Sequence, residues 1–302
     1  MKLQRFSRLL AIIVVLAVVL PAGAASADDP LPVSFFGIQT GDNAAEHEAL
    51  PLATTAGIGL LRFNLRWAEV EPAKTDPPTY HWAKYDALIG GAAGAGYDLI
   101  ITVRDNPAWA ATTACGPIDK VPLQRYLAFL TALVDRYGGA PYHVRMWELY
   151  NEPDNNDMNM PQQGGCWGQH AAAYGQLLAG AKPIVNAAGG QLVLGGVAMD
   201  FVESQGGPFN ANFMSQLLAS PGGTSFDVMN FHYYRAFHYV WDRYGPDVMG
   251  KVNFIRDNLL GQQGLSKPII VTEIGHPSAG PAGDGQNYSD AESSRYVVQA
   301  YA

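Results

Sequence analysis

The chain has 302 residues, of which 48% are apolar and only 15% are charged. A chain of this length and composition can bury a large core, and none of its segments is polar enough to be read as disordered. Its 27 acidic residues outnumber its 19 lysines and arginines, which gives a net charge of −8. Such an acidic surface disfavours nucleic acid and anionic membranes as partners.

The chain begins with the pattern of a secretory signal peptide. Three basic residues precede an apolar stretch from Leu9 to Leu20, and small residues follow up to Ala27. We therefore predict a signal peptide over residues 1–27 and one folded domain over residues 28–302. A membrane anchor is the alternative, but the apolar stretch is shorter than the about 20 residues that a spanning helix needs. We expect a secreted protein with no stable membrane insertion after cleavage.

Apolar runs of strand length alternate with helical patterns along the rest of the chain. The predicted strands cover residues 33–38, 59–65, 98–103, 144–150, 191–197, 226–231 and 268–274. The predicted helices cover residues 82–96, 123–137, 169–188, 209–218, 247–262 and 290–301. In the second helix, apolar residues follow the 3, 4, 7 spacing of one buried face. This alternation indicates βα units around a parallel sheet.

Seven such units favour an α/β fold of the (β/α)8 TIM barrel type, which has about 250 residues. An open doubly wound sheet is the alternative, but no Gly-x-Gly-x-x-Gly turn follows any predicted strand. The residues after Glu273 are taken up by a predicted loop and a helix, so no eighth strand is visible. We therefore expect a barrel that is truncated before its eighth strand, with strand edges left unpaired.

Polar side chains gather where the predicted strands end, which is where the active sites of such barrels lie. The residues at or just after these ends are Asp105, Asn106, Asn151, Glu152, His232, Tyr234 and Glu273, and Arg62 lies within the second predicted strand. Burying a carboxylate is costly unless it is paired, so packing alone does not account for these charges. Two glutamates, Glu152 and Glu273, are thus delivered to one rim. Paired carboxylates are the working groups of a glycosidase.

Several short motifs, in their order and spacing, resemble the clan A glycoside hydrolases, the retaining (β/α)8 enzymes of the 4/7 superfamily. The main ones are Leu61-Arg-Phe-Asn-Leu-Arg-Trp67, Asn106-Pro-Ala-Trp109, Trp147-Glu-Leu-Tyr-Asn-Glu-Pro153, Phe231-His-Tyr-Tyr234 and Val271-Thr-Glu-Ile-Gly275. Families 39 and 5, the latter cellulase-like, are the most similar in character. Family 5 enzymes tend to carry a histidine where the third strand here ends in Asp105-Asn106, which favours family 39.

The resemblance implies a role for each of the polar residues. Glu152 would be the general acid/base, and Glu273 would be the nucleophile that forms the glycosyl-enzyme. Arg62 and a hydrogen bond from Tyr234 would favour the ionised form of Glu273.

Three further residues bind substrate in this interpretation. Asn151 would hold the sugar 2-hydroxyl, and His232 would line the same subsite. Trp109 would stack on a sugar ring, although ordinary packing is an equally good reading of a tryptophan in a loop. Glu148, four residues before Glu152, is expected to have a structural or subsite role.

The two cysteines, Cys115 and Cys166, lie in predicted loops of a protein that would meet an oxidising compartment, so a disulfide between them is expected. Two unpaired thiols are the alternative. No metal site is predicted, because neither the cysteines nor the histidines have the spacing of metal ligands.

The resemblance thus implies a glycosidase that cleaves β-linked oligo- or polysaccharides by double displacement, and the signal-peptide pattern predicts that it is secreted. We expect a monomer without a cofactor. The alternative is a non-catalytic carbohydrate-binding barrel of the same fold. The identity of the sugar and exo or endo action stay open.

Overall fold

The structure is a computed structural model that describes residues 35–40, 50–156, 166–275, 289, 291–292 and 294–296. All of them belong to one compact unit, Val33–Ala302. The predicted signal peptide lies outside the described residues and stays a prediction. Within the described part, no helix is both long enough and apolar enough to cross a membrane.

Each of the seven predicted strands is present. The strands are β1 Gly37–Gln39, β2 Leu60–Arg66, β3 Asp98–Arg104, β4 Met146–Leu149, β5 Gln191–Leu194, β6 Met229–Tyr234 and β7 Ile269–Gly275. β1 and β5 are shorter than predicted. β4 ends one residue before Tyr150, whose left-handed φ of 60° takes it out of the strand.

The strands run parallel in chain order. β1 to β5 form one continuous sheet, and β6 pairs with β7. Single parallel bridges, Val193 to Val228 and Val197 to Phe231, join the two groups between β5 and β6. Strands in this order with helices between them have the architecture predicted from the sequence, the (β/α) barrel. The prediction that an eighth strand is missing falls mainly on residues 276–288 and 297–302, which lie outside the described residues.

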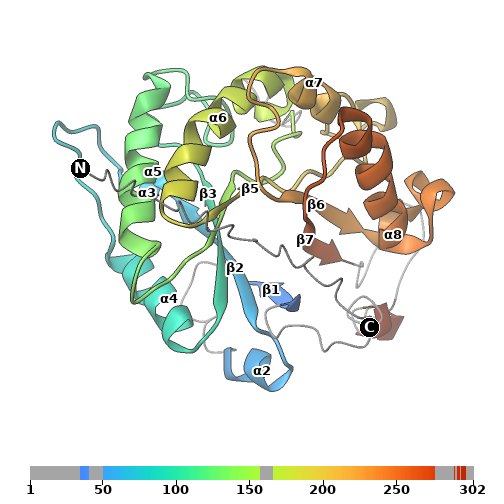
Figure 1. Cartoon of the computed structure of the whole chain (residues 1–302), viewed down its shortest axis with the longest axis horizontal. Helices are drawn as coiled ribbons and strands as arrows, with labels where there is room; N and C mark the ends of the chain where they lie inside the picture. The colour runs from blue at the N-terminus through green and yellow to red at the C-terminus, as the bar shows by residue number, and fades with distance from the viewer. Residues whose placement is uncertain are drawn as a thin grey trace, which may run out of the picture. The chain divides into compact units, whose positions relative to one another are not determined.

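The helices lie on the outside of the strands (Figure 1). The α-helices are α2 Leu50–Thr55, α3 Trp67–Val70, α4 Ala83–Gly94, α5 Leu123–Tyr137, α6 Ala171–Ala187, α7 Phe213–Ala219 and α8 Asp247–Asn253. The shorter 3-10 elements are η3 Trp167–Gln169, η4 Glu203–Gln205, η5 Arg235–Val240, η6 Asp242–Tyr244 and η8 Gly261–Gln263. The predicted helix over residues 247–262 changes form along its length, because α8 continues as the π-helix η7 Phe254–Leu260. The sequence patterns do not predict α2, α3, η4, η5 or η6.

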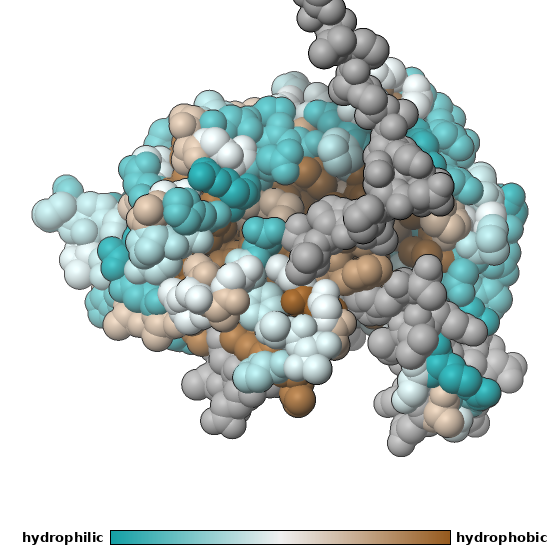
Figure 2. Space-filling view, turned by 60° about the horizontal axis from the view of Figure 1, so that its bottom comes forward, coloured by the Kyte–Doolittle hydropathy of each residue, from teal (hydrophilic) through white to brown (hydrophobic). Residues whose placement is uncertain are grey.

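The apolar core lies between the strands and the outer helices. Trp67 is fully buried and stacks on Phe129 of α5 with ring centroids 5.4 Å apart, while Tyr126 meets it edge-on at 5.2 Å. The opposite face of the strands, toward the barrel interior, carries polar side chains that bond to one another. The alternation of the strands therefore separates an apolar outer layer from a polar interior. Much of the periphery seen in Figure 2 is hydrophilic, with apolar side chains nearer the middle of that face.

Candidate active site

Arg62 on β2 connects most of the polar residues inside the barrel. It is only 3% exposed, and its Nε and Nη2 donate to Glu148 at 2.6 and 2.9 Å. Its Nη1 donates to Glu273 Oε1 at 2.9 Å and to Gln39 of β1, and its Nη2 also reaches Asn151 Oδ1 at 2.7 Å. Burial alone would lower the pKa of the guanidinium, but Glu148 and Glu273 raise it above its usual value. Arg62 is therefore a permanent cation shared by two carboxylates.

Glu148 is fully buried and fully bonded, as a structural residue should be. Besides Arg62, its carboxylate accepts hydrogen bonds from Thr102 Oγ1 at 2.7 Å, Gly196 N at 2.9 Å and Asn230 Nδ2 at 3.0 Å. Asn230 in turn accepts from Thr272 Oγ1 at 2.9 Å. The network joins β2, β3, β4, β6 and β7, so it fixes the strands that carry the candidate catalytic residues.

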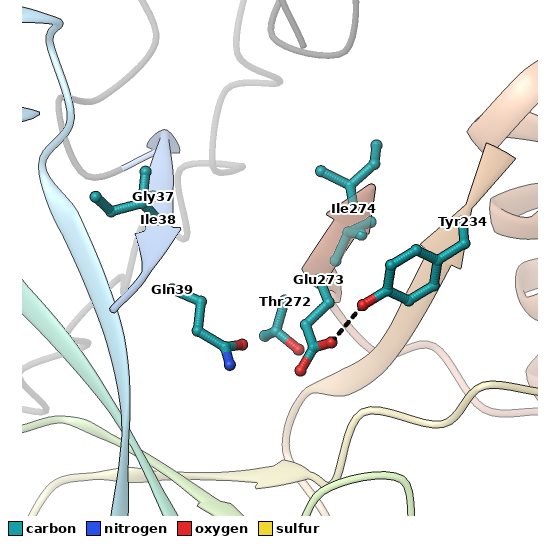
Figure 3. A pocket seen from close by; sticks show the side chains of 8 residues that line it. Gly37, Ile38, Gln39, Tyr234, Thr272, Glu273 and Ile274 are labelled. Carbon is teal, nitrogen blue, oxygen red and sulfur yellow. Dashed lines mark hydrogen bonds between the residues drawn. The ribbon is translucent and has the colours of Figure 1, made fainter. Parts of the chain in front are cut away.

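Glu273 on β7 is surrounded by donors that favour its ionised form. Tyr234 donates to Oε2 at 2.8 Å, as Figure 3 shows, and Arg62 donates to Oε1. Burial would raise the pKa of Glu273, but His232, Arg62 and the Tyr234 hydrogen bond together hold it below its usual value. Burial and Glu273 raise the pKa of Tyr234, so the phenol keeps its proton and stays a donor. Gly275 permits this contact, because a Cβ there would lie 2.7 Å from the Tyr234 ring.

A cavity of about 400 Å³ lies beside Glu273, between β1 and β7. Its lining comes from the two strands and Tyr234, namely Gly37, Ile38, Gln39, Tyr234, Val271, Thr272, Glu273 and Ile274. Gln39 and Glu273 point into this space from opposite sides (Figure 3). A ligand in this cavity would therefore contact the carboxylate of Glu273.

Glu152 follows β4 in an unusual backbone conformation. Its φ is 46°, in the left-handed region that residues with a side chain rarely adopt. Its N–H donates to Gly196 O at 3.0 Å, and its carboxylate lies 3.0 Å from His232 Nδ1. Such conformations persist only where the surroundings hold them, and they cluster at functional sites.

His232 on β6 lies between the two candidate catalytic glutamates. Its Nδ1 contacts Glu152, and its Nε2 lies 3.5 Å from Glu273 Oε1. The ring fits because residue 196 is glycine, since a Cβ there would lie 2.2 Å from Nε2. One ligand atom from each of Glu152, His232 and Glu273 lies within 4.8 Å of the others. These three could hold a divalent cation, but Arg62 already supplies a positive charge to the same carboxylate.

Asp154 ties the segment after Glu152 to the segment after β5. Its buried carboxylate accepts hydrogen bonds from the N–H groups of Ala198 at 3.1 Å and Met199 at 2.8 Å. Burial raises the pKa of Asp154 to about 6 in spite of these bonds. The neighbourhood of Glu152 is thus organised from two sides, by His232 and by Asp154.

The structure brings together six of the predicted site residues, Arg62, Asn151, Glu152, His232, Tyr234 and Glu273. It does not bring Trp109 to them. The Trp109 indole donates to the Glu71 carbonyl at 3.0 Å, and its ring packs edge-on against Trp67 at 5.3 Å and under Arg125. These contacts of Trp109 are those of a packing residue.

Cys115 and Cys166 form a disulfide. The loop that contains Cys115 is also held by Asn106, whose side chain donates to the carbonyls of Thr113 and Gly116. Tyr150 donates to Asn106 at 2.6 Å. Asn106, two residues after the end of β3, therefore braces a loop.

Four residues that contact the site residues were not predicted from the sequence. They are Gln39, Gly196, Asn230 and Thr272. The pair Gly195-Gly196 directly after an apolar run was a usable signal, because adjacent glycines at a strand end indicate close approach of another group. Asn230 and Thr272 were recognisable only as polar residues within otherwise apolar strands.

Comparisons with known structures place the fold among glycoside hydrolases. One similar structure is a family 39 glycoside hydrolase from the gut symbiont Bacteroides cellulosilyticus WH2, with 21% identity, a TM-score of 0.61, and coverage of 89% of this chain and 53% of that one. A fungal β-1,4-galactanase, from a structural description of two such enzymes, has 16% identity, a TM-score of 0.59, and coverage of 87% of this chain and 83% of that one. The Pseudomonas stutzeri endoglucanase Cel5A has 16% identity, a TM-score of 0.51, and coverage of 84% and 72%. The chain thus spans about half the length of the family 39 protein.

The sequence comparisons agree with the fold. A search of curated proteins gave no match. The family model "Cellulase (glycosyl hydrolase family 5)" matches residues 27–301. The predicted clan is confirmed, and of the two families left open the match selects family 5, against the preference drawn from Asp105-Asn106. Because the match runs through nearly the whole chain, the protein belongs to glycosyl hydrolase family 5, the cellulase family.

Proposed function

We propose that this protein is a secreted, retaining glycoside hydrolase that cleaves O-glycosidic bonds of β-linked oligo- or polysaccharides by double displacement. The observation that carries the proposal is the arrangement of Glu152 and Glu273 after β4 and on β7, where one carboxylate oxygen of each lies within 4.8 Å of the other. Retaining enzymes hold their carboxyl groups about 5 to 5.5 Å apart, whereas inverting enzymes need about 6.5 to 9.5 Å to admit water. The approach of one oxygen of Glu152 to one oxygen of Glu273 within 4.8 Å supports the retaining arrangement.

The surroundings of Glu273 support its role as the nucleophile. It must be ionised to attack the anomeric carbon, and Arg62, Tyr234 and His232 favour that state. Attack forms the glycosyl-enzyme bond to Glu273 and breaks the bond between the anomeric carbon and the leaving-group oxygen.

Glu152 would carry the proton in both steps. As an acid it protonates the departing oxygen, and as a base it then takes a proton from the water that releases the sugar. Its carboxylate is 23% exposed, so water has access to it. Asn151, whose side-chain oxygen accepts a hydrogen bond from Arg62, would bind the 2-hydroxyl of the sugar.

The names of the similar structures define the substrates to test first. β-1,4-Galactan and β-1,4-glucan correspond to the galactanases and the endoglucanase, and xylan and mannan complete the panel. Secretion is part of the proposal because of the signal-peptide pattern. A disulfide, which is typical of oxidising compartments, supports it.

The test is a Glu273→Gln variant, compared with wild type on aryl β-glycosides and the polysaccharide panel. We expect it to fold, because glutamine keeps the shape of the side chain, and to lose turnover. The matched control is Glu69→Gln, which alters an exposed carboxylate paired with Lys84. Trapping with a 2-fluoro glycoside should label Glu273 in the wild type. Unchanged turnover in Glu273→Gln, or no covalent adduct in an active protein, would contradict the proposal and favour a carbohydrate-binding barrel.

A further inference from the structure

Outside the cluster described above, a buried ion pair holds the segment that follows β5. Lys251 of α8 is fully buried, and its Nζ lies 2.7 Å from Asp200 Oδ2. It also donates to the carbonyls of Ala198 and His232 and lies 4.8 Å from the centroid of the Trp241 ring. Burying a charge is costly unless it is paired, and the partners of Lys251 are Asp200 and the two carbonyls of the surrounding segments.

The segment held in this way is strained. Met199 has a φ of 54° and Phe201 a φ of 49°, both in the left-handed region. A Cβ on Gly207 would lie 1.7 Å from the Phe201 carbonyl oxygen, so only glycine lets the chain return past Phe201. Strain of this kind persists where surrounding contacts enforce it, and here the Asp200–Lys251 pair supplies them.

The effect of this conformation is to present an aromatic ring to solvent. Phe201 is 38% exposed and stacks on Phe237 of η5, with ring centroids 5.5 Å apart and an interplanar angle of 17°. Scattered exposed apolar side chains are common in proteins and mean little singly. Phe201 differs from such residues because it stacks on a second ring and lies on backbone that is strained and held in place. Packing alone would favour burying its side chain.

The backbone that leads to Phe201 is hydrogen-bonded to the segment after Glu152. Ala198 and Met199, just before Phe201, donate to Asp154, two residues after Glu152. Lys251 binds the carbonyl of His232, whose ring contacts Glu152. In the proposed mechanism Glu152 protonates the leaving group, so the Glu152 side is the one on which the departing part of the substrate lies.

We infer that Phe201 and Phe237 form a stacking surface for a sugar ring of a β-linked glycan on the leaving-group side of the site. The inference rests on the proposed function. The C–H face of a β-linked pyranose is apolar, and phenylalanine offers a flat ring with no polar atom, so stacking removes apolar surface of both partners from water. Aromatic side chains with few polar groups are the usual lining of ligand sites.

The test compares two substrates of whichever sugar the wild-type enzyme hydrolyses. A β-linked hexaose reaches the leaving-group side, whereas the β-glycosyl fluoride places a single atom there. In Phe201→Gly and Phe237→Ala we expect the ratio of kcat/KM for the hexaose to kcat/KM for the fluoride to fall about tenfold. Tyr239→Ala is the matched control, because Tyr239 is another exposed aromatic residue of η5, and it should keep the wild-type ratio.

Phe201→Gly also separates a binding role from a structural one. Glycine adopts a positive φ readily, so this variant should unfold at a temperature no lower than wild type while its ratio falls. A lower melting temperature with an unchanged ratio would make Phe201 a packing residue and overturn the inference. So would an equal fall in Tyr239→Ala.

Calorimetric binding of cello-, xylo-, manno- and β-1,4-galactohexaose to Glu273→Gln tests the surface without turnover. If the wild type hydrolysed none of these sugars, the proposed function would fail. The inference would still be decided by binding, which should weaken when Phe201→Gly is added to Glu273→Gln. Equal affinity of the single and double variants, or binding by neither, would overturn it.

Discussion

Arg62 binds the carboxylate of Glu148 through two nitrogens, Nε at 2.6 Å from Oε2 and Nη2 at 2.9 Å from Oε1, with both side chains almost completely buried. Only Nη1 remains directed at Glu273 and Gln39. Glu148 therefore orients the guanidinium and balances most of its charge. The nucleophile candidate receives one hydrogen bond from a cation whose position is set elsewhere.

Replacing Glu148 by glutamine should strongly destabilise the protein. The substitution keeps the shape but removes the charge that faces a buried guanidinium, and breaking such a pair from one side costs about 3–5 kcal/mol. Urea unfolding at neutral pH gives the change in the free energy of unfolding. Glu69→Gln is the control, because its pairing with Lys84 is exposed and should change the free energy by less than about 1 kcal/mol. A similar small change in both variants would contradict this account of Glu148.

Tyr234→Phe should shift the pH dependence of activity upward on the acid side. The Tyr234 hydroxyl donates to the ionised form of Glu273 and helps to lower its pKa, so removing the hydroxyl raises that pKa. The acid limb of kcat/KM, which reports the free enzyme, should then move to higher pH. Tyr239→Phe is the control and should leave the profile unchanged. An acid limb that stays in place would show that Tyr234 does not tune Glu273.

The lowered pKa of Glu273 also makes the stability of the folded protein depend on pH. A carboxyl group whose pKa is lower in the folded state adds stability above its unfolded pKa, near 4.5 for glutamate, and this stability is lost as the pH falls through the folded pKa. Wild type should thus lose free energy of unfolding as the pH falls below about 4.5. Tyr234→Phe should show a smaller loss over that range in urea unfolding.

Replacing Gly196 by alanine should lower the activity of the enzyme. The added Cβ would overlap the His232 ring, which must move away from Glu152 and Glu273. Displacing a group at a reacting centre by about 1 Å can cost about 10²-fold in rate. Gly91→Ala in α4 is the control, since nothing lies within 4 Å of its added Cβ and alanine favours a helix. Wild-type kcat/KM in Gly196→Ala would mean that the position of His232 does not matter.

The strands and the ends that carry Glu152 and Glu273 could be predicted because they depend on local pattern. An apolar run bounded by turns predicts a strand, and a charge at its end is visible in the sequence itself. The end of β4 was less predictable, since the left-handed φ of Tyr150 depends on what surrounds it. The change from α8 to the π-helix η7 likewise leaves no mark on the apolar spacing.

The polar network inside the barrel could not be predicted from the sequence, because its contacts are not local. Asn230 meets Glu148 from 82 residues away, and Thr272 meets Asn230 from 42 residues away, so both contacts depend on how separate strands align. Trp109 illustrates the converse, because a tryptophan in a loop looks the same in sequence whether it stacks on a ligand or packs on Trp67. Tertiary contacts decide such cases.

The disulfide between Cys115 and Cys166 closes a covalent ring that includes Glu152 and leaves Arg62, His232 and Glu273 outside. A single backbone cut between residues 116 and 156 would open this ring without releasing a fragment. The two pieces would run as one species on a gel without reductant and separate once it is added. Glu152, the acid/base candidate, therefore lies on the disulfide-closed stretch of the described chain, where a single endoproteolytic cut leaves the two pieces covalently joined.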